Sequence, residues 1–149
     1  MRVSSNLASL ALAASTTHAA TNYLINNCDF DVYYRTVGGD QSVFESTPIK
    51  AKSTVTTAQF FRVSGTTIKI TKNPDGIWKS EPTLQFSYTY QPNATIWYNL
   101  STDYGYDFWG FKVALGGINA DWAIWNGAPG TDRTLSYVGE KDLALKLCE

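Results

Sequence analysis

Residues 84–100 read LQFSYTYQPNATIWYNL. Apolar and polar side chains alternate with a period of two on both sides of Gln91-Pro92-Asn93, which has the composition of a turn. Because successive side chains of a β-strand point to opposite faces, each half of the stretch presents one apolar face. These faces are formed by Leu84, Phe86, Tyr88 and Tyr90 before the turn and by Ile96, Tyr98 and Leu100 after it. The stretch therefore predicts two consecutive strands, each with one buried face.

The same alternation recurs in both directions along the chain. It is present over residues 30–35, 67–71, 111–115 and 143–148. Segments rich in glycine, asparagine, aspartate or proline break these runs at 38–40, 73–76, 116–117 and 126–130. Short strands separated by regular turns are typical of β-sandwiches and barrels. We predict an all-β fold, an antiparallel β-sandwich, with no helix longer than a turn or two.

The first 19 residues have the pattern of a secretory signal peptide. Arg2 supplies a positive charge, and residues 7–14 form a short apolar run. Thr17-His18-Ala19 then places threonine at −3 and alanine at −1 for cleavage after Ala19. The apolar run is too short to span a bilayer. We predict a signal peptide over residues 1–19 and a single β-sandwich domain over residues 20–149.

Two cysteines, Cys28 and Cys148, remain after the signal peptide. An even number of cysteines in an exported chain indicates a disulfide bond. The bond would tie the first strand to the last and enclose nearly the whole domain. The alternative is a pair of free or intermolecular thiols.

The charge pattern limits the partners of the protein. Removal of Arg2 lowers the 12 lysines and arginines to 11, against 13 aspartates and glutamates, and no basic block is present. Nucleic acid is a poor partner for such a surface. No second apolar run approaches the length of a membrane helix. We expect a monomer that binds neither nucleic acid nor a membrane and that is released to the extracellular space or the cell wall.

The chain has one histidine, His18, and it leaves with the signal peptide. A zinc site of histidines and cysteines, a Ser-His-Asp triad and a histidine-bound copper site all need residues that the remaining chain lacks. We therefore expect no metal, no cofactor and no catalytic residue. Carboxylate chemistry is the one hydrolytic route left open, because glycosidases work with a pair of acids.

The strongest local cluster of such groups is residues 103–109, DYGYDFW. Its members Asp103, Tyr104, Tyr106, Asp107, Phe108 and Trp109 form a candidate acidic and aromatic patch for carbohydrate. Glu81 and Asp121 could join it in space. The competing interpretation, which we favour, is a loop whose aromatic side chains fold back to cap the sandwich. Trp97 lies on the polar face of its strand and is harder to place in a core.

Two sequons, at Asn93 and Asn99, match the N-glycosylation acceptor pattern. If residues 95–100 form a strand, Asn99 falls on the outward face, where a glycan can attach. The alternative for Asn99 is a structural hydrogen-bonding residue. We predict N-glycosylation at both asparagines.

Several segments together resemble one protein family. They are residues 27–33 (NCDFDVY), 68–70, 97–101 (WYNLS), 105–108 with Gly110, and 145–148 (LKLC). In this order they resemble the Blastomyces yeast-phase-specific proteins, which are small secreted fungal proteins. That family is itself similar to thaumatin-like proteins, and the resemblance implies a thaumatin-like sandwich. Some thaumatin-like members bind or cleave β-glucan through an acidic cleft, but Asn99 stands at the first acidic position of that pattern here.

The residues and the resemblance together predict a secreted fungal protein with no enzymatic activity. We expect an effector, or a module that binds at the cell wall or the host surface, with a cell-wall polysaccharide or a host protein as partner. One alternative is a thaumatin-like carbohydrate-active protein that binds or weakly hydrolyses β-glucan. Another is a passive constituent of the cell surface.

Overall fold

A computed structural model describes residues 20–62 and 64–149, and the predicted signal peptide lies outside these residues. Over the described ranges the chain forms eleven strands and no helix. The strands are β1 (Thr21–Asn26), β2 (Val32–Gly38), β3 (Thr47–Ile49), β4 (Ser53–Ala58), β5 (Thr66–Thr71), β6 (Thr83–Gln91), β7 (Thr95–Asp103), β8 (Lys112–Gly116), β9 (Ala123–Asn126), β10 (Leu135–Val138) and β11 (Leu143–Leu147). Accordingly, the part of the chain that is described contains no helix able to cross a membrane.

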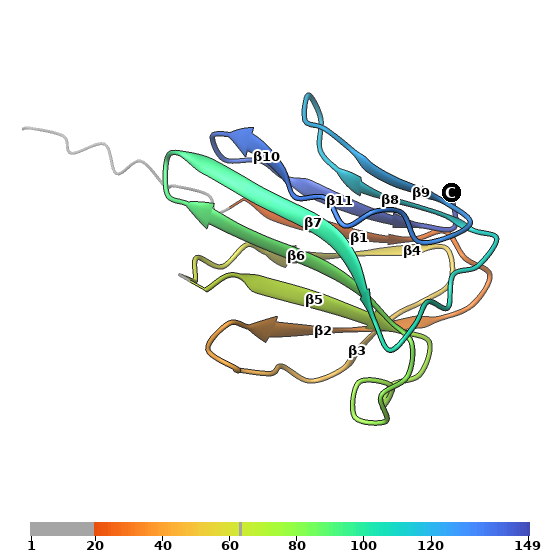
Figure 1. Cartoon of the computed structure of the whole chain (residues 1–149). Coiled ribbons are helices and arrows are strands. Elements are labelled where there is room, and N and C mark those ends of the chain that lie inside the picture. The colour runs from red at the N-terminus through yellow and green to blue at the C-terminus, as the bar shows by residue number, and fades with distance from the viewer. Residues whose placement is uncertain (1–19, 63) are drawn as a thin grey trace, which may run out of the picture.

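The strands form two sheets packed face to face (Figure 1). One sheet has five strands in the order β4-β1-β11-β8-β9, and the other has six in the order β10-β7-β6-β5-β2-β3. The all-β, two-layer prediction is thus confirmed.

The β6–β7 hairpin is the longest unit of the six-stranded sheet and corresponds to the two strands predicted from residues 84–100. Each strand has nine residues, and the register pairs Phe86 with Leu100 and Tyr88 with Tyr98. All four of these side chains are buried. Alternation of apolar and polar residues has therefore set both the inward face and the outward face of this hairpin.

The core fills the space between the sheets. Ile68, Ile70 and Leu84 enter it from the six-stranded sheet, and Leu115 and Leu145 enter it from the five-stranded sheet. Each of these five side chains is at most 1% exposed, so the centre of the core is removed from water. Such burial is the main favourable term for a sandwich of this size.

The prediction of a purely antiparallel sandwich is wrong for one pair of neighbouring strands, β1 and β11. β1 runs parallel to β11, with Asn22 opposite Leu143 and Asn26 opposite Leu147. Parallel neighbours need a long connection between them. Here almost the entire domain lies between the two strands, so the first and last strands can point in the same direction.

The predicted disulfide is present and closes this parallel pair. Cys28 follows β1 and Cys148 follows β11, with an S–S distance of 1.97 Å and a Cα–Cα distance of 5.0 Å. The bond lies two residues beyond the end of one strand and one beyond the end of the other. It therefore fastens the pair where the hydrogen-bond ladder stops.

Asn26 supports the same corner from inside. Its side chain is fully buried, and Nδ2 donates hydrogen bonds to the backbone carbonyls of Phe30 and Ile49 at 2.9 and 3.0 Å. Its Oδ1 accepts a hydrogen bond from the backbone N–H of Cys28 at 3.0 Å. One amide thus joins the end of β1, the half-cystine and β3.

Removing the disulfide should destabilise the domain strongly. The bond encloses a sequence separation of 120 residues. Chain-entropy estimates give about 4–5 kcal/mol for loops of this size. We expect the C28A/C148A double variant to lose about that much free energy of unfolding in a urea titration. The reduced wild-type protein should behave in the same way, and a loss below about 1 kcal/mol in both would contradict this account of the bond.

Asn26→Ala should be costly for a different reason. The substitution leaves buried backbone groups without partners, and each unsatisfied group costs about 1–3 kcal/mol. We expect a loss of at least about 3 kcal/mol in urea unfolding, with the disulfide still formed by mass spectrometry. Asn27→Ala removes the same atoms from a half-buried neighbouring position and should change stability by less than about 1 kcal/mol. A loss for Asn26→Ala as small as the one expected for Asn27→Ala would show that the buried amide is not needed.

Candidate functional site

The outer face of the six-stranded sheet carries an ordered array of polar side chains. Strand register places Arg35, Lys69, Gln85 and Ser101 in one row across β2, β5, β6 and β7. The next row contains Thr67, Ser87 and Asn99. Beyond it, Thr89 of β6 and Ser136 of β10 flank Trp97 of β7. Each row is held at strand spacing because the opposite side of the same strands is packed in the core.

Asp103 belongs to this face and is occupied by its neighbours. Its carboxylate lies 3.5 Å from Lys69 Nζ, and it accepts a hydrogen bond from Gln85 Nε2, also at 3.5 Å. Gln85 in turn accepts a hydrogen bond from the Ser101 hydroxyl at 3.2 Å. The acid that began the predicted patch is therefore part of a surface network that is balanced in charge.

A groove of about 330 Å³ runs over the middle of this face. Its walls include Thr67, Ser87, Thr89, Trp97, Asn99 and, from the segment before β10, Thr134. Trp97 is 37% exposed, and a hydrogen bond of 2.8 Å joins the Thr67 and Ser87 hydroxyls. The volume is at the lower end of the range of about 300–1,000 Å³ that is usual for small-ligand sites.

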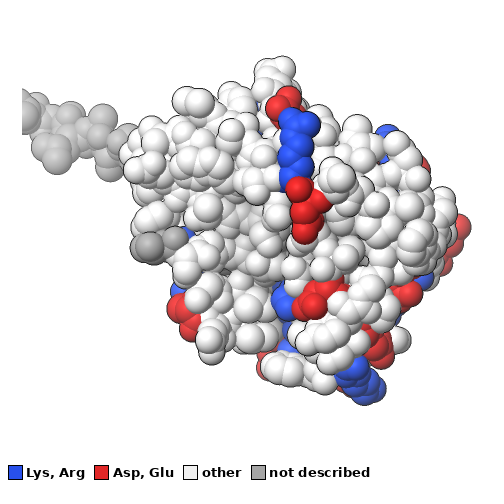
Figure 2. Space-filling model, in the orientation of Figure 1, with Lys and Arg blue, Asp and Glu red and all other residues white. Residues whose placement is uncertain are grey.

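The groove combines one aromatic face with several hydroxyls and an amide. An aromatic ring offers a flat apolar surface, and hydroxyl and amide groups can exchange hydrogen bonds with a polar ligand. In the orientation of Figure 2, much of the visible surface is free of charged side chains, and several of the basic groups lie beside acidic ones. The chemistry of the groove therefore suits a neutral, hydroxyl-rich ligand.

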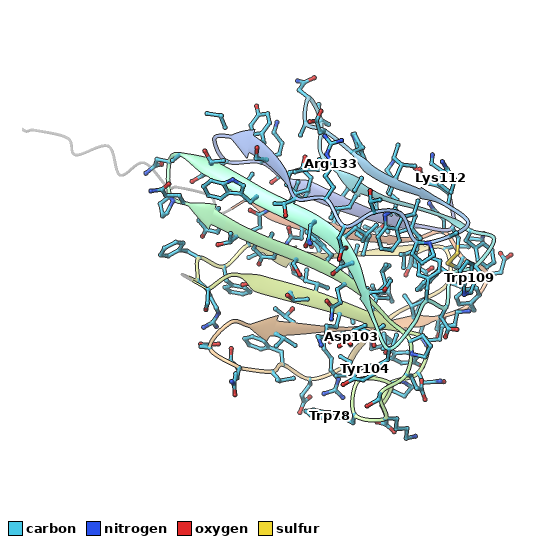
Figure 3. The ribbon with its side chains drawn as sticks, in the orientation of Figure 1. Trp78, Asp103, Tyr104, Trp109, Lys112 and Arg133 are labelled. Atoms are coloured by element: carbon cyan, nitrogen blue, oxygen red, sulfur yellow. A yellow bond between two sulfur atoms is a disulfide. The ribbon has the colours of Figure 1, made fainter. Side chains whose placement is uncertain are left out.

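The predicted patch over residues 103–109 is divided by the structure. Tyr106 and Phe108 are buried in the core, where Tyr106 packs edge-on against Trp125 with ring centroids 5.6 Å apart. Tyr104 and Trp109 are exposed on the connection from β7 to β8 (Figure 3). The aromatic members are thus not gathered on one surface.

The other acidic residues proposed from the sequence, Asp107, Glu81 and Asp121, each lie in a different local environment. Asp107 is half-buried in the same connection. The Glu81 carboxylate accepts a hydrogen bond from Asn73 Nδ2 at 2.8 Å, and the backbone carbonyl of Asp121 accepts one from the Tyr98 hydroxyl at 2.6 Å. Among the described residues, no group of three or more histidine, cysteine, aspartate or glutamate side chains could hold a metal ion.

The two sequons lie at different places on the β6–β7 hairpin. Asn93 is exposed in the turn and adopts a left-handed backbone conformation, with φ of 57°. Asn99 is half-buried on the outer face, opposite Ser87, and lines the groove. Only the second sequon therefore adjoins the groove.

Two other hollows differ in character. One, of about 290 Å³, lies between Trp122, Trp125 and Arg133 (Arg133 is labelled in Figure 3). The other, of about 350 Å³, is bordered by Phe44 and Phe60, whose rings stack with centroids 6.4 Å apart. Phe44 and Phe60 are 47% and 45% exposed, so this second hollow has two exposed aromatic rings among polar side chains that include Glu45. Neither brings together as many hydroxyl groups as the groove beside Trp97.

The architecture defines a class of small two-sheet β-proteins closed by a single disulfide. Residues 9–149 match the family described as Bys1, Blastomyces yeast-phase-specific protein, and the chain belongs to this family. A comparison with curated proteins gives no match. Among solved structures, the fold is similar to the protein elicitor MoHrip2 from Magnaporthe oryzae, with a TM-score of 0.72 and 23% sequence identity. The similarity covers 88% of this chain and all of that one.

Tyr106 provides a test of its assignment to the core. Its hydroxyl is buried without a hydrogen-bond partner among the described residues, and burial raises the pKa of Tyr106 to about 12. Tyr106→Phe removes an unsatisfied polar atom and should leave stability unchanged or raise it by up to about 1–2 kcal/mol. Tyr106→Ala should cost about 3–5 kcal/mol.

Urea unfolding of both variants measures these effects. Because the folded-state pKa lies above the unfolded value, the wild-type protein should lose stability as the pH rises from about 10 to 12. Tyr106→Phe should lose less over the same interval. A wild-type Tyr106 that titrates like an exposed tyrosine would contradict its place in the core.

Proposed function

We propose that this protein is an exported, non-catalytic binding protein, and that the groove beside Trp97 holds a neutral cell-surface polysaccharide. The observation that carries the proposal is Trp97, a partly exposed tryptophan set among hydroxyl and amide groups in a groove whose described lining residues carry no charged side chain. Polymers of neutral sugars present both apolar ring faces and many hydroxyls. Glucan, chitin and cellulose are neutral sugar polymers of this kind that occur in fungal or host cell walls.

Export is supported by three features. The first 19 residues have the pattern of a signal peptide. The disulfide between Cys28 and Cys148 is of the kind that persists in oxidising compartments. The fold is similar to that of MoHrip2, which is described as a protein elicitor. An effector-like role at a host or wall surface is consistent with all three.

The absence of catalysis is also part of the proposal. A glycosidase needs one carboxylic acid that donates a proton and a second carboxylate. The Asp103 carboxylate lies 3.5 Å from Lys69 Nζ and accepts a hydrogen bond from Gln85, so it is engaged by neighbours on the sheet and is not part of an acidic pair. A thaumatin-like relationship would supply an acidic cleft, but Asn99 occupies the position of its first acid. Hydrolysis of β-glucan through Asp103 and Asp107 remains the alternative that the experiment must exclude.

The test is co-sedimentation of the unglycosylated protein, made in bacteria with the disulfide formed, with insoluble β-1,3-glucan, chitin and cellulose. We expect binding to at least one polymer and about tenfold weaker binding for Trp97→Ala, since a central tryptophan contributes at least about 1.4 kcal/mol. Trp109→Ala is the matched control, because Trp109 is more exposed but lies outside the groove. Circular dichroism checks that both variants are folded.

Three results would contradict the proposal. Failure to sediment with any of the polymers would exclude a wall polysaccharide and favour a protein partner, for which the exposed Phe44 and Phe60 provide an apolar surface. A larger loss of polymer binding for Trp109→Ala than for Trp97→Ala would show that the binding site lies on the connection between β7 and β8. Soluble sugar released by the wild type but not by Asp103→Asn would establish catalysis.

A further inference from the structure

Asn99 is both an acceptor for N-glycosylation and part of the groove wall. In a strand, residues two apart lie on the same face about 6.5–7 Å from each other. Trp97 is two residues before Asn99 on β7, so their side chains share the outer face. The first sugar attached to Asn99 Nδ2 would thus lie within reach of the exposed indole.

The surroundings of Asn99 restrict the direction of such a glycan. Ser87 stands directly opposite on β6, and Thr134 lines the groove from the segment before β10. Asn99 is half-buried, so its amide is not raised above the surface as that of Asn93 is. A glycan that leaves Asn99 passes along the same hydroxyls and the same tryptophan that the proposed function assigns to a free polysaccharide.

The groove has room for one occupant. Its volume of about 330 Å³ is close to the smallest that small-ligand sites show. A covalently attached sugar also has a high effective concentration at its own position, because its binding is intramolecular. A free polymer must therefore displace a tethered competitor.

We propose that an N-linked glycan on Asn99 lies in the groove over Trp97 and closes it to free polysaccharide. The form that binds polysaccharide is then the one in which Asn99 carries no glycan, and the extent of modification at this residue sets the fraction of active protein. This inference rests on the proposed function, because it concerns the regulation of the same groove.

Asn93 supplies a matched comparison within the same hairpin. It is exposed in the turn between β6 and β7 and is not among the residues that line the groove. A glycan at Asn93 should leave the groove open. Thr95→Ala removes this sequon alone, and Ser101→Ala removes the Asn99 sequon while both Asn99 and Trp97 stay in place.

The experiment uses protein secreted from a glycosylating eukaryotic host, in wild-type, S101A and T95A forms. Mass spectrometry of peptides measures occupancy at each asparagine, and sedimentation with the polymers above measures binding. If the glycan fills the groove about nine-tenths of the time, apparent affinity falls about tenfold. We expect S101A to bind about tenfold more tightly than the wild type and T95A to bind as weakly as the wild type.

Trimming the glycans to a single N-acetylglucosamine separates groove filling from shielding by a large glycan. We expect the trimmed wild type to remain weak, because the first sugar is the one beside Trp97. Recovery of full binding after trimming would overturn the proposal, as would an unmodified Asn99 in the secreted protein. Equal binding of the wild type and S101A with Asn99 occupied would overturn it as well.

The bacterial protein distinguishes these failures from failure of the proposed function. If the unglycosylated protein binds and the glycosylation variants do not differ, only the inference about Asn99 fails. If the unglycosylated protein binds no polymer, the proposed function itself fails and the inference fails with it.

Discussion

The parallel pairing of β1 with β11, fastened by Cys28–Cys148, is the constraint on which the rest of the molecule depends. β11 lies between β1 and β8 at the centre of the five-stranded sheet. That sheet is incomplete until the last strand has been placed, so its order depends on contact between residues at opposite ends of the domain. Such long-range contacts carry a large entropic cost of closure, which the disulfide removes once it has formed.

The five-stranded sheet in turn supports the surface that we associate with function. Its inner face supplies the apolar layer against which β5, β6 and β7 are packed. Phe86, Tyr98 and Leu100 are buried in this layer. Because Ser87 and Asn99 alternate with them along the same strands, the outward side chains are held in place as well. Most of the groove wall is therefore held by strands, and Thr134 joins it from the segment before β10. Side chains on strands are positioned more precisely than side chains on loops.

Much of the fold could be predicted from local patterns. The alternation over residues 84–100 predicted β6 and β7, and an even cysteine count behind a signal-peptide pattern predicted the disulfide. β4, with the sequence STVTTA, could not be predicted because it has no large apolar residue, and β1 could not because two of its three buried residues are asparagines. β3, β9 and β10 have only three or four residues, too few to show alternation. The parallel pair could not be predicted, since strand direction across 120 residues leaves no local signal.

The site was harder to predict than the fold for the same reason. Residues 103–109 are neighbours in the sequence, but the connection from β7 to β8 buries Tyr106 and Phe108 in the core, while Asp103 is the last residue of β7. Thr67, Ser87 and Thr134 lie on three segments that are far apart in the sequence. Strand register brings Thr67 opposite Ser87, and the segment before β10 brings Thr134 to the same groove. The available signal was Trp97, a large aromatic residue on the polar side of an alternating strand.

Titration of the unglycosylated, ¹⁵N-labelled protein with short β-1,3-glucan, chitin and cellulose oligosaccharides, followed by NMR, tests the central claim most directly. The account predicts that one of these sugars shifts the Trp97 indole N–H and the amides of Ser87 and Asn99, while amides of the 104–111 segment stay in place. Shifts centred on that segment or on Phe44 and Phe60, or no shifts with any of the three sugars, would contradict it.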